Sequence, residues 1–97
     1  MKRTKALHIS ALLHDFYREN PKVWQKILEI RIQRGWGEIL RPVIMKSTQN
    51  LYVKNHVLYV FLNSSVLRNE LLLNRKRLLK VLNEYAGAEV IHDIVIR

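Results

Sequence analysis

The change of hydrophobic period at residues 50–65 constrains the fold more than any other feature of the chain. The segment NLYVKNHVLYVFLNSS alternates β-branched and aromatic residues with others, whereas the segments on either side repeat apolar residues at helical spacing. Asn55-His56 lies at the bend of this segment, and a two-residue hairpin turn requires positive φ, which asparagine tolerates. The segment therefore predicts a β-hairpin between two helical regions.

A turn at Asn55-His56 also predicts the strand register. The predicted pairs are Lys54 with Val57, Val53 with Leu58, Tyr52 with Tyr59, and Leu51 with Val60. One face of the hairpin is then wholly aliphatic and is the better candidate for the core. That face consists of Leu51, Val53, Leu58, Val60 and Leu62. The opposite face carries Tyr52, Tyr59 and Phe61, which are candidates for a partner surface or for stacking on nucleic-acid bases.

Helical spacing on both sides of the hairpin predicts the rest of the fold. Residues 9–19 predict one helix, Asn20-Pro21 begins a second, and a third runs from about residue 32 or 35 to 46 with Trp36 in the core. After the hairpin, Ser64 or Ser65 caps a helical region that ends at Gly87. Its apolar stripe is Val66, Leu67, Leu71, Leu78, Leu82 and Tyr85. Residues 88–97 alternate as a third strand, with Val90, Ile94 and Ile96 on one side.

The chain of 97 residues is the size of one domain. We expect N-terminal helices at 1–31 and a core at 32–97 in the order α-β-β-α-α-β. The fold class is α+β, with helices on one face of a three-stranded sheet.

A cationic break interrupts the late helical region. Asn74-Arg75-Lys76-Arg77 stands where an apolar residue is due, so we predict two helices with a short turn at 74–76. A helix N-terminus beside Arg75, Lys76, Arg77 and Lys80, together with Arg68, is a candidate anion site. The alternative is a solvated charged corner, neutralised by Glu70 and Glu84.

The net charge narrows the class of partner. Seventeen Lys and Arg against eight Asp and Glu give +9, and a field of that sign attracts polyanions such as nucleic acid. No apolar run approaches the length of a membrane span, and the absence of cysteine excludes disulfides and thiolate zinc sites. The four histidines are scattered, and no nucleophile or phosphate-loop motif is present. We therefore expect a cytoplasmic protein that is not an enzyme, with no catalytic residue, metal or cofactor.

Two resemblances add to these predictions. The order of elements over residues 32–97 resembles the type II KH-like fold, whose members clamp a nucleic-acid backbone with a G-x-x-G loop between two helices. In this chain the loop position reads Asn74-Arg75-Lys76-Arg77, which is cationic but contains no glycine. More closely, WGEIL (36–40), LYVKNHVLYVFLNSSVLRNELLLNRKRLL (51–79) and LNEYAGAEVIHDIVIR (82–97) resemble the DciA family.

The DciA resemblance implies an accessory protein of bacterial DNA replication. Such a protein loads or operates the replicative helicase and binds DNA; we expect single-stranded DNA to be favoured, with RNA possible. Where the family often has glycine after W-x-x-I-L, this chain has Arg41-Pro42, and larger members carry a tail beyond the last strand. Two alternatives stay open: a KH-like RNA-binding or ribosome-associated module, and a protein-interaction domain that binds no nucleic acid.

Overall fold

The computed structural model describes residues 16 and 18–97. In this part of the chain the order is α2 (Pro21–Ile39), α3 (Pro42–Ser47), β1 (Thr48–Lys54), β2 (Val57–Leu62), α4 (Ser65–Leu73), α5 (Arg75–Ala86) and β3 (Asp93–Ile96). The predicted α+β class is confirmed, with three strands in the order β1-β2-β3. The helix predicted for residues 9–19 lies largely outside the described residues. No described helix is both long and apolar enough to cross a membrane.

The helices before the hairpin divide at a different place from the one predicted. We expected a third helix to begin at residue 32 or 35, but α2 continues unbroken to Ile39, so that prediction was wrong. The break falls at Leu40 and Arg41, which are both extended. Arg41 precedes Pro42, and the proline ring disfavours helical backbone in the residue before it. Pro42 then begins α3, where its missing N–H costs no hydrogen bond.

The hairpin forms with the predicted register. Asn55 and His56 occupy the turn with φ values of 52° and 62°, the positive values that a two-residue turn requires. Lys54 pairs with Val57 and Tyr52 with Tyr59, and the other two predicted pairs are also present. β3 lies parallel to β2, so the sheet is mixed. It begins later than predicted, because residues 88–92 lead into it as a loop.

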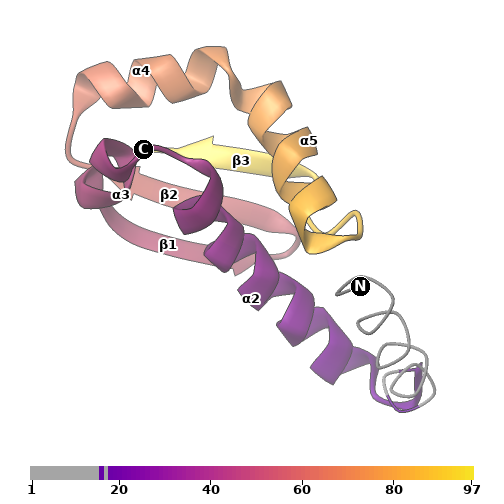
Figure 1. Ribbon diagram of the computed structural model, residues 1–97. Helices are drawn as coiled ribbons and strands as arrows, with labels where there is room; N and C mark the ends of the chain where they lie inside the picture. Colours follow the sequence, from indigo (N-terminus) through magenta and orange to yellow (C-terminus); the bar gives the residue numbers. More distant parts are fainter. Residues whose placement is uncertain (1–15, 17) are drawn as a thin grey trace, which may run out of the picture.

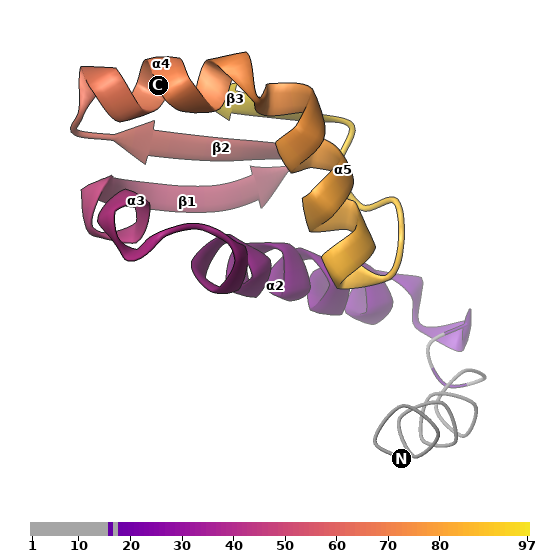
Figure 2. The same cartoon turned by 45° about the horizontal axis from the view of Figure 1, so that its top comes forward.

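The core lies between the sheet and the helices that cover one of its faces (Figures 1 and 2). Leu58 and Val60 of β2 are fully buried there, as the alternation predicts. α5 crosses α2, and α4 runs along the sheet beside β2 and β3. Two residues assigned to the core stripe lie elsewhere: Val66 is 74% exposed and Tyr85 is 41% exposed. Val66 lies in the first turn of α4, on the side away from the buried Leu71.

Gly35 of α2 lies against the ring of Tyr85 of α5. A Cβ atom added there would lie 2.8 Å from Cδ1 and 3.3 Å from Cγ of the Tyr85 ring. Glycine is a poor residue for the interior of a helix, and it costs about 1 kcal/mol relative to alanine. It fits inside α2 because the Tyr85 ring occupies the space that a side chain would need.

This packing predicts an opposite effect of one substitution in two backgrounds. Gly35→Ala should lower the free energy of unfolding by about 1 kcal/mol, because overpacking of about 1–3 kcal/mol exceeds the gain in helix propensity. In a Tyr85→Ala background the same substitution should raise it by about 0.5–1 kcal/mol. Urea denaturation of the four proteins measures both effects. Equal effects in the two backgrounds would show that the ring does not exclude the methyl group.

Candidate nucleic-acid interface at the α4–α5 junction

Asn74 separates α4 from α5 and forms the corner at which the two helices meet (Figure 1). Its backbone N–H donates to Leu71 O at 3.1 Å, and its carbonyl accepts from Leu78 N–H at 2.9 Å. Its side-chain Nδ2 donates back to Glu70 O at 3.0 Å, so Asn74 closes α4 without capping α5. The predicted break into two helices is confirmed, and α5 begins with no side-chain cap and no acidic residue in its first turn.

The four cations of the first turns of α5 lie on the surface. Arg75, Lys76, Arg77 and Lys80 are all exposed. Arg75 lies 3.5 Å from Asp93, measured from Nη1 to Oδ1, and both side chains are about half exposed, so this pair is weak. Within residues 16 and 18–97 the other three form no ion pair. Cations at a helix N-terminus are unfavourable in isolation, so this arrangement favours a bound anion.

The acidic residues that the alternative interpretation assigned to this corner, Glu70 and Glu84, form no ion pair with its cations. Glu70 Oε1 accepts from Arg41 Nη2 at 2.7 Å, which joins α4 to the segment between α2 and α3. Glu84, one turn after Lys80, forms no ion pair with a described residue. Lys76, Arg77 and Lys80 therefore form no ion pair inside the described part of the molecule.

Arg68 is not brought to this corner. It lies in the first half of α4, half-buried, and its Nη2 donates to Leu62 O at 3.1 Å. Its Nε is buried without a hydrogen-bond partner. The guanidinium of Arg68 thus ties α4 to the end of β2, because the carbonyl there needs a donor where the strand ends. The sequence analysis grouped Arg68 with the cations of α5, because the hydrogen bond to the Leu62 carbonyl could not be predicted from sequence spacing.

Two leucines that the sequence analysis did not single out lie beside the cations. A shallow depression at the corner is lined by Leu72, Leu73, Asn74, Arg75, Lys76 and Arg77. Leu73 is 87% exposed and Leu72 is 44% exposed. A signal for them is present in the sequence: three consecutive leucines on a helix cannot all face one core, and Leu71 fills the core position.

The aromatic side chains of the hairpin form a separate surface. Tyr52 stacks on Tyr59 with ring centroids 5.0 Å apart and on Phe61 at 6.1 Å. All three are half-buried and alternate with the core residues of the hairpin, so they lie on the sheet face opposite the helices. The structure therefore does not bring them together with Arg75, Lys76 and Arg77.

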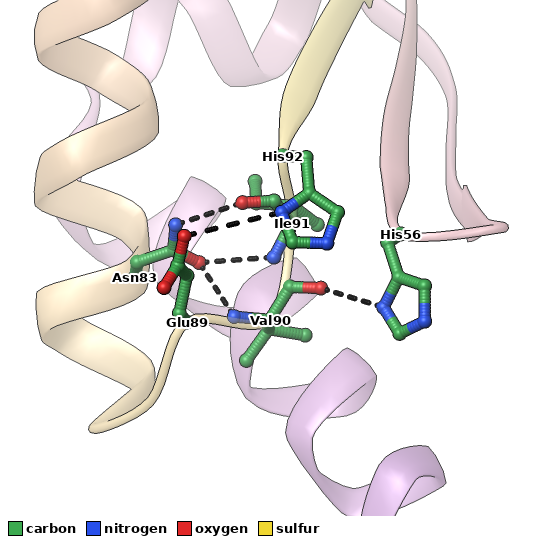
Figure 3. A network of polar contacts seen from close by, with 6 residues as sticks. All are labelled: His56, Asn83, Glu89, Val90, Ile91 and His92. Atoms are coloured by element: carbon green, nitrogen blue, oxygen red, sulfur yellow. Dashed lines mark hydrogen bonds and ion pairs between the residues drawn. The ribbon is translucent and has the colours of Figure 1, made fainter.

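A polar network at the other end of α5 holds the loop before β3 (Figure 3). Asn83 Oδ1 accepts from Val90 N–H at 3.0 Å and from Ile91 N–H at 3.1 Å, and its Nδ2 donates to Ile91 O at 2.9 Å. The rings of His56 and His92 lie 5.3 Å apart beside this loop. No group of three or more potential metal ligands exists among the described residues. This network is structural.

The described residues thus form a small α+β domain with a cluster of exposed cations at the α4–α5 junction. A model of the DciA family (Dna[CI] antecedent, DciA) matches residues 8–96, so the chain belongs to the DciA family. No curated protein matches the sequence. Family membership gives the chain a role in loading or operating the replicative helicase in bacterial replication, and that role is not enzymatic. The resemblance found in the sequence is thereby confirmed.

Proposed function

We propose that this protein binds single-stranded DNA through Arg75, Lys76, Arg77 and Lys80 while it serves the replicative helicase in the cytoplasm. The observation that carries the proposal is the exposure of these cations at one corner, with three of them unpaired among the described residues. The net charge of +9 adds long-range attraction to a polyanion. Family membership supplies the setting, a partner helicase that acts on DNA.

The order of elements supports the same location. In a KH-like arrangement the junction between two consecutive helices contacts the nucleic-acid backbone. Asn74–Arg77 occupies that junction here without a glycine, so long cationic side chains make the contact in place of a closely approaching backbone. Contacts of this kind reach phosphates and carry little sequence information. We therefore expect weak sequence preference and strong salt dependence.

Replacing Arg75, Lys76 and Arg77 by alanine tests the site. Four neutralised phosphates predict a log–log salt slope of roughly −3 for the wild type, and the triple variant should fall to about −1. At about 0.1 M salt its affinity for a dT oligomer should drop by about 30- to 100-fold. Fluorescence anisotropy over a salt series measures both quantities. The thermal midpoint should change little, because the replaced side chains are exposed.

A charge-matched control separates the site from net charge. Lys22, Lys26 and Lys46 are exposed and lie on other elements, so their triple alanine variant loses the same charge away from the corner. It should retain affinity within a few-fold of the wild type. Equal losses in the two triple variants would contradict the assignment to this corner. Tighter binding of an equally long RNA would favour the RNA-binding alternative, and no binding to either would favour a protein-interaction domain.

A further inference from the structure

We propose that Leu72 and Leu73 form an apolar contact for the bases of the single strand whose phosphates the neighbouring cations hold. This inference rests on the proposed function and adds to it a second kind of contact, made with the bases. It also assigns a preference: the site should favour unpaired bases, whose faces are open, over a duplex, whose bases are stacked inside.

The two leucines and the cations belong to one surface. Leu72, Leu73 and Asn74 line the same depression as Arg75, Lys76 and Arg77. Leu73 is the most exposed large apolar residue of the described chain, at 87%, and it lies at the last position of α4. Single exposed apolar residues are normal on protein surfaces. Two adjacent ones inside a cationic depression form an amphipathic surface with a charged side and an apolar side.

A single nucleic-acid strand has the matching chemistry. Its phosphates are anionic and its bases present flat apolar faces, and proteins that bind single strands combine a positive groove with aromatic side chains on which those faces stack. Leucine serves as an apolar wedge against bases in other DNA-binding proteins. At this corner the apolar side chains immediately precede the cationic ones, so one strand can contact both at once.

Charge argues against a second copy of the chain as the occupant. A symmetric contact through Leu72 and Leu73 would bring Arg75, Lys76 and Arg77 of both copies together, and like charges across an interface are unfavourable. A polyanion with apolar groups fits this surface better. An anionic lipid surface shares part of that chemistry and is therefore included in the experiment.

The experiment compares two probes: a dT oligomer and an oligomer of abasic deoxyribose phosphates of the same length. Wild-type protein should bind the dT oligomer about tenfold more tightly than the abasic one, because burying apolar side chains against bases adds to the phosphate contacts. Leu72→Ala/Leu73→Ala should lose that difference. It should bind the abasic oligomer like the wild type and keep the same salt slope.

The matched control is Val43→Ala/Val66→Ala, which removes two apolar side chains that are 50% and 74% exposed and lie outside the depression. It should keep the tenfold preference for bases. Leu73→Ala alone changes the more exposed of the two leucines and should lose part of the preference for bases. This single variant replaces the double variant in the experiment if the double variant is unstable.

Three outcomes would overturn the inference. An unchanged preference in the leucine variant would show that the leucines do not contact bases. An equal loss of affinity for the dT oligomer and the abasic oligomer would show that the leucines only support the phosphate contacts. Leucine-dependent binding to phosphatidylglycerol vesicles, with DNA binding unaffected, would assign them to a lipid surface. In all three cases the effect of replacing Arg75, Lys76 and Arg77 still decides the proposed function, so the two failures are distinguishable.

Discussion

Replacing Trp36 by alanine is expected to lower the free energy of unfolding by about 3–5 kcal/mol. The side chain is completely buried in α2 and packs in the core beneath the sheet. Its Nε1 donates to Thr48 Oγ1 at 3.2 Å, and that hydroxyl donates to Ile44 O at 2.7 Å. One side chain therefore joins α2, α3 and the start of β1. A domain of this size has a total free energy of unfolding of about 5–10 kcal/mol. The variant should therefore be near the limit of folding at 37 °C.

Trp36→Phe and Trp24→Phe complete this test. Trp36→Phe keeps an aromatic ring but leaves the Thr48 hydroxyl without its donor, and about 2 kcal/mol should be lost. Trp24 is half-buried, with the Arg31 guanidinium 5.3 Å from its ring centroid, so Trp24→Phe should cost less than about 1 kcal/mol. In the Trp36 variants Trp24 remains as a fluorescent reporter for urea denaturation. A loss below about 1.5 kcal/mol for Trp36→Ala would contradict its central position.

Replacing Asn83 by alanine is expected to cost about 3 kcal/mol. Three hydrogen bonds to the backbone of Val90 and Ile91 disappear, at about 1 kcal/mol each. Both residues are 1% exposed, so water cannot readily replace the lost partners. The amides of Val90 and Ile91 should also lose protection in hydrogen exchange, because both N–H groups donate to Asn83 Oδ1 in the wild type.

Asn83→Asp gives a graded version of the same test. A carboxylate can accept from both N–H groups but cannot donate to Ile91 O, so its cost should lie between zero and that of alanine. Asn69, which is exposed on α4, provides the control: Asn69→Ala should stay within about 0.5 kcal/mol of the wild type. If Asn83→Ala were equally neutral, the loop would not depend on the Asn83 amide.

Local patterns predicted the hairpin and the α4–α5 break. The register follows from a two-residue turn and a period of two, both of which are local in sequence. The break at Asn74 follows from polar residues at an apolar position. The sequence predicted the division of α2 from α3 less well, because Gly35 is a usual signal for a helix end. The glycine at position 35 instead makes room for the ring of Tyr85, which lies fifty residues away in the sequence.

The site was predictable in charge but not in detail. The cations of the corner stand together in the sequence, so their exposure on one helix start could be expected. The pairing of Glu70 with Arg41 joins segments 29 residues apart, which no local pattern records. Arg68 binds the Leu62 carbonyl, and Asn83 binds the loop before β3; both contacts depend on how consecutive elements fold back on each other, and neither has a sequence signature of its own.

The turn of the hairpin has a consequence for how the nascent chain completes its fold. His56 has a φ of 62°, a conformation that a side chain makes costly. Its carbonyl accepts from His92 N–H at 2.7 Å. Its Nδ1 lies 3.1 Å from Val90 O, as Figure 3 shows. Both partners, and β3 after them, are synthesised later than the hairpin. Until β3 pairs with it, β2 keeps an unpaired edge, which can pair with strands of other molecules and so promotes aggregation of incomplete chains.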